Sequence, residues 1–140
     1  MWPGGSTRAR DATARPTVAL ACPEPRLRRI LGLSLEAVGL AIVDWRCPSR
    51  PPASPPCVVV ADLDSLGWDP TTALQRLAEA GLDPATPALL ISVYPYEPDG
   101  LARGRRLAVL QPPFSSHELT NRVHALIPGK GAADGSPRPT

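Results

Sequence analysis

The segment Val58-Val59-Val60-Ala61-Asp62-Leu63-Asp64 is the most informative stretch of this chain. It opens with a short run of small or β-branched apolar residues, which is typical of a strand buried on both faces of a parallel sheet. Gly67 and then Asp69-Pro70 follow, and these are signals for a turn and for the start of a helix. An acid at the carboxyl end of such a strand lies where open α/β sheets place their functional groups. Asp62 is therefore the first candidate for a functional residue.

Strand and helix patterns alternate on both sides of this segment. Short apolar runs at 17–21, 40–45, 88–93 and 107–110 predict further strands. Apolar residues at helical spacing predict helices from Pro25 to Gly39, from Pro70 to Gly81, and after a capping box formed by Ser115 and Glu118. The alternation predicts parallel βαβ units in one α/β domain.

The strand and helix patterns also predict which side chains are buried. The helix stripes are Leu27, Ile30, Leu31, Leu35 and Val38, then Leu74, Leu77 and Ala78, and finally Leu119, Val123, Leu126 and Ile127. The strand residues expected to be buried together are Val18, Leu20, Val59, Val60, Leu89, Leu90 and Val109.

The composition is that of one modest globular domain. The chain has 140 residues, of which 43% are hydrophobic and 20% charged, and its net charge of +2 gives no reason to expect nucleic-acid binding. No apolar run is long enough to cross a membrane, and the first residues lack the apolar core of a signal peptide, so we expect a cytoplasmic protein whose cysteines are free thiols. We expect disordered tails at 1–16 and 128–140 around a domain at 17–127.

Segments spread over residues 17–127 together resemble a response-regulator receiver domain of two-component signalling. They are the strand 58–63 with the loop after it, the strand that ends in Ser92, the turn at Pro113 with the helix that follows, and the first helix. The resemblance implies a flavodoxin-like five-stranded parallel sheet of order 2-1-3-4-5 with flanking helices. It also implies that Asp62 is equivalent to the phosphoacceptor, that Ser92 and Val109 hold the switch positions, and that the peptide bond before Pro113 is cis.

The chain departs from the family pattern at the positions that would carry the chemistry. The acidic pair that binds Mg²⁺ in the family falls on Cys22 and Pro23, with Glu24 beside them. The family lysine falls on Pro112, or on Gln111 if the alignment shifts by one. A thiol and a proline are poor ligands for Mg²⁺, and neither Pro112 nor Gln111 supplies the cation that a phosphoaspartate would face. We therefore expect weak or absent Mg²⁺ binding and no other metal or cofactor.

The helices depart from the family pattern as well. The proline-rich segment 46–56 replaces the helix between the second and third strands, and prolines and glycines in 94–104 leave the fourth helix short or absent. The family's usual output face is then reduced to the fifth strand and the last helix. We expect a homodimer or a partner contact at the strand edge formed by Arg105, Arg106 and Leu107.

Three interpretations of Asp62 remain open: a solvated acid that caps the loop after its strand, a phosphoacceptor, or another kind of ligand. The first agrees with a stand-alone, atypical bacterial receiver that signals by protein–protein contact, without Mg²⁺-dependent phosphorylation. The resemblance implies a histidine kinase or an effector as its partner. The alternatives are a phospho-accepting receiver and a small-molecule-binding module at the strand ends near Cys22, Asp62, Ser92 and Gln111. The sequence has no nucleotide-binding motif and no visible nucleophile–base pair, so an enzyme is not expected.

Overall fold

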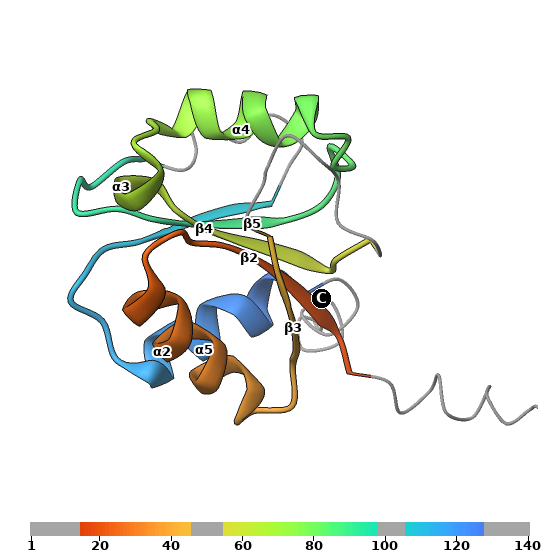
Figure 1. Cartoon of the computed structure of the whole chain (residues 1–140), viewed down its shortest axis with the longest axis vertical. Coiled ribbons are helices and arrows are strands. Elements are labelled where there is room, and N and C mark those ends of the chain that lie inside the picture. Colours follow the sequence, from red (N-terminus) through yellow and green to blue (C-terminus); the bar gives the residue numbers. More distant parts are fainter. Residues whose placement is uncertain (1–14, 46–54, 98–105, 128–140) are drawn as a thin grey trace, which may run out of the picture.

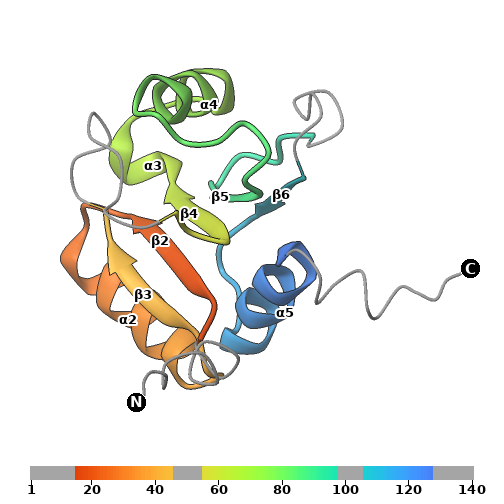
Figure 2. The same cartoon turned by 90° about the vertical axis from the view of Figure 1, so that its right-hand side faces the viewer.

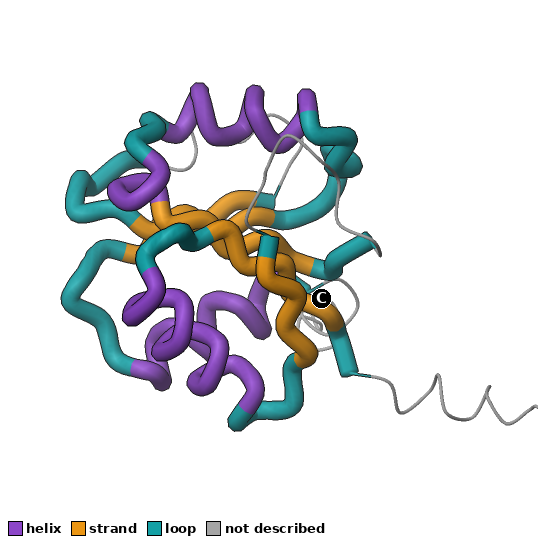
Figure 3. The backbone as a smooth tube through the Cα atoms, in the orientation of Figure 1, coloured by secondary structure: helices purple, strands orange, loops and turns teal. Residues whose placement is uncertain are grey.

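The computed structural model describes residues 15–45, 55–97 and 106–127. Its strands are β2 (Thr17–Ala21), β3 (Ala41–Asp44), β4 (Val58–Asp62), β5 (Ala88–Ile91) and β6 (Leu107–Leu110), and its helices are α2 (Pro25–Glu36), α3 (Leu63–Leu66), α4 (Pro70–Glu79) and α5 (Ser116–Leu126). All paired strands are parallel, and the sheet order is β3-β2-β4-β5-β6. Counted along the described chain this is the order 2-1-3-4-5, so the predicted flavodoxin-like fold is confirmed (Figures 1 and 3).

β4 lies in the middle of the sheet, and every one of its residues is buried (Figure 2). Successive side chains of a strand point to opposite faces. Val60 therefore enters the core between the sheet and the helices α2 and α5, whereas Val59 enters the core under α3 and α4. The prediction that one set of strand residues is buried together is wrong in this respect. The set divides into Val18, Leu20, Val60 and Leu89 on the first face and Val59 and Leu90 on the second, where Val109 is only half-buried.

Helices α2 and α5 cover one face of the sheet (Figure 1). The predicted stripe of α5 is buried, together with Thr120, which was not predicted, and the capping box of Ser115 and Glu118 is confirmed. In α2 the residues that contact the sheet form one narrow ridge, Leu27, Leu31 and Leu35, at a spacing of i, i+4. The prediction was wrong for Ile30 and Val38, which are 57% and 43% exposed. Ile30 lies beside the ridge, and Val38 lies beyond the last helical residue.

Helices α3 and α4 cover the opposite face (Figure 1). Asp69 caps α4 as predicted, with its carboxylate accepting a hydrogen bond of 2.7 Å from the Thr72 amide. The helix buries Leu77 as predicted and also Ala73, which was not predicted. Leu74 and Ala78 were both expected to be buried, but Leu74 is half-buried and Ala78 is exposed. The single turn α3 was not predicted, and it begins directly after Asp62 and ends at Gly67, whose φ of 72° is left-handed.

β5 ends earlier than predicted, at Ile91. The reason lies in the backbone: the Ser92 amide still donates to Leu110, but the Val93 amide donates to the carboxylate of Asp64 instead of to the neighbouring strand. Residues 93–97 contain no helix. The predictions for the proline-rich segment, for the rest of the fourth helix and for both tails concern 46–54, 98–105, 1–14 and 128–140, which lie outside the described residues.

Candidate functional site

The carboxyl ends of the parallel strands gather the polar residues that the sequence singled out. Asp62 is the last residue of β4, Cys22 follows β2, Ser92 follows β5 and Gln111 follows β6. Because parallel strands end at the same edge of a sheet, these residues share that edge. The structure brings Cys22 and Asp62 into direct contact, whereas Ser92 and Gln111 have other partners.

Asp62 is a buried acid, with only 3% of its surface exposed. Its carboxylate accepts hydrogen bonds from the Ser65 hydroxyl and, over 3.8 Å, from the Cys22 thiol. Burial raises the pKa of Asp62 above its ordinary value, and the neighbouring charge of Asp64 raises it further, while the hydrogen bonds from Ser65 and Cys22 oppose the shift. The prediction of a solvated acid is therefore wrong in one respect: Asp62 is packed inside the sheet edge.

Cys22 lies next to Asp62 and is 2% exposed. Its thiol donates to Asp62 and, over 3.6 Å, to the carbonyl oxygen of Glu24. Burial, together with the charge of Asp62, raises the pKa of this thiol to about 11. The sulfur therefore stays a neutral S–H at physiological pH and serves as a hydrogen-bond donor. It does not act as a nucleophile or a metal ligand, because both roles require the thiolate.

Glu24 has a structural partner of its own. Its carboxylate caps α2, accepting hydrogen bonds from the amides of Leu27 at 2.8 Å and Arg26 at 3.3 Å. Pro23, between Cys22 and Glu24, offers no donor side chain. The three residues after β2 thus provide a thiol, a proline ring without a ligand atom, and a carboxylate that caps the N-terminus of α2.

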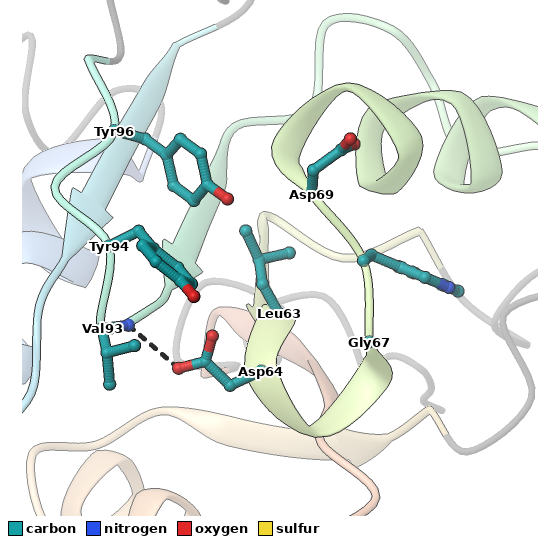
Figure 4. A pocket seen from close by; sticks show the side chains of 8 residues that line it. Leu63, Asp64, Gly67, Asp69, Val93, Tyr94 and Tyr96 are labelled. Atoms are coloured by element: carbon teal, nitrogen blue, oxygen red, sulfur yellow. Dashed lines mark hydrogen bonds between the residues drawn. The ribbon is translucent and has the colours of Figure 1, made fainter.

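Ser92 points its hydroxyl at Asp64, which lies two residues after Asp62. The hydroxyl donates to Oδ1 of Asp64 at 3.1 Å and accepts from the Tyr94 amide at 3.1 Å. Oδ2 of Asp64 accepts from the Val93 amide at 2.9 Å (Figure 4). Asp64 therefore ties the loop after β5 to the helical turn after β4, a role that the sequence did not reveal. Its only signal was a second acid directly after the strand.

The turn after β6 takes the predicted backbone form. The peptide bond between Pro112 and Pro113 is cis, as predicted. Gln111, the alternative lysine position, donates from its amide to the carbonyl oxygen of Val93 at 2.8 Å. Val109, the second switch position, is half-buried, and its carbonyl oxygen accepts from the Arg122 guanidinium at 3.1 Å. Neither Pro112 nor Gln111 brings a positive charge to Asp62.

The donor set at this edge does not fit Mg²⁺. This hard cation needs several oxygen ligands. The edge offers the two carboxylates of Asp62 and Asp64 beside the neutral thiol of Cys22, while Glu24 is held at the N-terminus of α2. Within residues 15–45, 55–97 and 106–127, no group of three or more histidine, cysteine, aspartate or glutamate side chains is placed to hold a metal ion.

The predicted interaction edge is partly described. β6 is an edge strand of the sheet, and Leu107 is half-buried against the second core. Arg106 is exposed, and its guanidinium donates to the carbonyl oxygen of Ala125 in α5. Arg105 lies outside the described residues.

Comparison with solved structures places this fold among receiver domains. A response regulator receiver protein from Sinorhizobium medicae has a TM-score of 0.64 and 21% identity, covering 83% of this chain and 97% of its own. The receiver domain of a Francisella response regulator has a TM-score of 0.63 and 19% identity, covering 80% and 96%. The receiver domain of a sensor histidine kinase from Pseudomonas aeruginosa, which holds a magnesium ion in its active-site cleft, has a TM-score of 0.61 and 13% identity, covering 81% and 98%.

The chain therefore has the fold of the response-regulator receiver domains. No protein-family model matches the sequence, and the search of curated proteins finds no match. No helix among the described residues is long and apolar enough to span a membrane.

Proposed function

We propose that this chain is an atypical receiver domain that acts in signal transduction by binding another protein, without Mg²⁺-dependent phosphorylation of Asp62. The observation that carries the proposal is the contact between the Cys22 thiol and the Asp62 carboxylate. A thiol with a raised pKa occupies a position where the resemblance expects a carboxylate ligand of Mg²⁺. The next carboxylate along the chain, Glu24, caps α2.

The charges around Asp62 support the same proposal. A phosphoryl group would add roughly −1.5 to −2 of charge beside Asp64. The guanidinium of Arg28 donates to the carbonyl oxygen of Cys22 at 3.3 Å and forms an ion pair with Asp44 at 3.5 Å, and no cationic side chain among the described residues forms an ion pair with Asp62 or Asp64. Positioning and neutralisation of charge are the main contributions of a protein to phosphoryl transfer. Without them, Asp62 is a poor phosphoacceptor.

The proposal also covers the setting of the protein. The partner is a protein of a signalling pathway in the cytoplasm, such as a histidine kinase or an effector, and nucleic acid is not a partner. The proposal assigns no enzymatic activity to the chain. The Cys22–Asp62 contact is not an activated nucleophile, because the buried thiol is protonated and its side-chain partner is Asp62, not a histidine base.

A phosphorylation assay tests the proposal directly. The full chain is incubated with acetyl phosphate and Mg²⁺, and its intact mass is measured. We expect the mass to stay unchanged in nearly all molecules. An adduct in good yield that disappears in Asp62→Asn would overturn the proposal and establish a phospho-accepting receiver.

A matched variant tests the cause. Cys22→Asp combined with Pro23→Asp restores the acidic pair while leaving Glu24 to cap α2. Binding of beryllium fluoride with Mg²⁺ is followed by fluorine NMR on both proteins. We expect a bound signal for the double variant and none for the wild type. A bound signal of equal strength in the wild type would show that Cys22 and Pro23 do not prevent metal-dependent chemistry.

A further inference from the structure

A hollow of about 470 Å³ lies beside the candidate site, between the loop after β5 and the residues of α3 and the start of α4 (Figure 4). Tyr94 and Tyr96 stand on one side of it, and their ring centroids are 6.0 Å apart with an angle of 55° between the planes. Leu63 and Asp69 lie opposite, and Asp64 lies below Tyr94, where its carboxylate accepts a hydrogen bond from the Val93 amide. The hollow is open to solvent, since Tyr94 is 61% exposed.

The electrostatic character of the hollow is one-sided. Asp64 and Asp69 both line it, and no basic side chain is among its described lining residues. Each of the two carboxylates is fixed by hydrogen bonds from its own surroundings, Asp64 by Ser92 and Val93 and Asp69 by Thr72. The hydrogen bond from Thr72 also lowers the pKa of Asp69, so this carboxylate stays ionised. Two held negative charges beside aromatic rings favour a cation.

The aromatic lining narrows the kind of cation. A guanidinium is planar, is weakly hydrated and stacks on aromatic rings while donating to carboxylates, whereas an ammonium is a compact, strongly hydrated charge. The molecule already contains one such contact, because the guanidinium of Arg76 lies 5.9 Å from the ring centroid of Trp68, at the border of the hollow. The hollow is open and shallow, so it suits a side chain that enters from another surface.

We infer that this hollow binds an arginine side chain of the protein partner, with its guanidinium against the Tyr94–Tyr96 pair and attracted by the negative charges of Asp64 and Asp69. The inference rests on the proposed function and deepens it, because it names the chemistry that the partner must present. The contact also reaches the candidate site, since Asp64 holds the hydroxyl of Ser92.

A peptide titration tests the inference. A short peptide with one arginine among glycine and serine residues is added to the isotope-labelled full chain, and backbone and indole NMR signals are recorded. We expect binding in the millimolar range, with the largest shifts at Gly67, Trp68, Val93 and Tyr94. A matched peptide carries citrulline, which has the shape of arginine without the charge, and we expect about a tenfold weaker response. A lysine peptide is expected to bind more weakly than the arginine peptide.

Variants of the hollow locate the site. Asp69→Asn removes a charge but keeps an equally good helix cap, and Tyr94→Leu changes an exposed side chain, so both are expected to fold. Each should weaken arginine-peptide binding about five- to tenfold. The control is Glu79→Gln, an exposed acid of α4 away from the hollow, which should leave binding unchanged.

Several results would overturn the inference: no shifts with the arginine peptide, equal shifts with the citrulline peptide, or equal weakening by Glu79→Gln. The inference also fails if free acetyl-argininamide binds with the same affinity as the arginine peptide and every variant weakens both equally. The hollow would then be a site for a small molecule and not for a protein partner. The mass and beryllium fluoride assays do not involve the hollow. A failure of the peptide to bind is thus distinguishable from a failure of the proposed function.

Discussion

Asp62 is an acid in a position that disfavours its charge. It is the last residue of a strand buried on both faces, and the groups that solvate its carboxylate are a thiol and a hydroxyl. A carboxylate with such neutral donors and a second acid nearby is stabilised less than one paired with a cation. The residue therefore lowers the stability of the folded protein when it is ionised.

This yields a pH-dependent prediction for Asp62→Asn. The pKa of Asp62 is raised in the folded state, so the loss of stability caused by its charge is absent below the ordinary pKa of 3.8. This loss develops as the pH rises from 3.8 through the raised pKa. We expect the variant to be more stable than the wild type at neutral pH, on the order of 1 kcal/mol, and the difference to vanish in acid. Urea unfolding across this pH range measures it.

Asp83→Asn is the control for that measurement, because Asp83 is exposed and only its local turn depends on it. It measures what replacing an exposed aspartate by asparagine does by itself, without the burial of Asp62. A wild type that is more stable than Asp62→Asn at neutral pH would mean that the carboxylate of Asp62 has a stabilising partner.

At the same scale, the sequence located Asp62, Ser92 and Cys22 at the strand ends but not their partners. The hydrogen bond from Ser92 to Asp64 joins the loop after β5 to the helical turn after β4, and it depends on side-chain positions that no local pattern encodes. Ser65 was missed for the same reason. The hollow lined by Tyr94 and Tyr96 could not be predicted, because the proline-containing segment has no periodicity.

At the scale of elements, the ends of the helices follow local chemistry closely. Glu24 caps α2, Asp69 caps α4 and Ser115 caps α5, each through its own side chain. The sequence predicted the last two, because aspartate and serine are common N-caps, whereas glutamate is not. Glu24 therefore looked like a displaced metal ligand until the structure showed its hydrogen bonds to the amides of α2.

The cap predicts the effect of Glu24→Ala. Loss of two hydrogen bonds to the first turn of α2 should lower the free energy of unfolding by about 1 kcal/mol. The control is Glu36→Ala at the other end of the same helix, which removes an acid near the negative end of the helix dipole and should be neutral or slightly stabilising. Equal effects of the two substitutions in denaturant unfolding would contradict the assignment of Glu24 as a cap.

The central strand predicts the cost of a cavity. Val60 is fully buried in the core under α2 and α5, so Val60→Ala should lower the free energy of unfolding by about 1–3 kcal/mol through lost burial and a residual cavity. Val109→Ala removes the same atoms from a half-buried site at the sheet edge and should cost clearly less. Chemical denaturation of both variants measures the difference, and a cost within about 0.5 kcal/mol for Val60→Ala would contradict its place in the core.

At the scale of the whole molecule, the fold follows from the alternation of apolar runs and helical stripes, which the sequence shows plainly. The division of the strand residues into two cores did not follow as readily, because a strand buried on both faces has no polar side to mark the alternation. The helices show the division, because α2 and α5 pack against one face of the sheet and α3 and α4 pack against the other.

The sheet ends at β6, and this edge leads to a prediction about assembly. An edge strand presents backbone groups that another chain can pair with, although the carbonyl oxygen of Val109 in β6 already accepts from Arg122, and the exposed Arg106 lies beside β6. We expect a homodimer or a partner contact through this edge that weakens in Arg106→Glu, where a negative charge replaces a positive one. Sedimentation over a range of protein and salt concentrations measures the homodimer.

Arg29→Glu, on the exposed side of α2, is the control for the change in charge. Since Arg106 also holds the carbonyl oxygen of Ala125, circular dichroism must show that α5 stays folded in the variant. A chain that remains monomeric at high concentration, together with a signalling partner that binds Arg106→Glu as well as wild type, would exclude this edge as the interface.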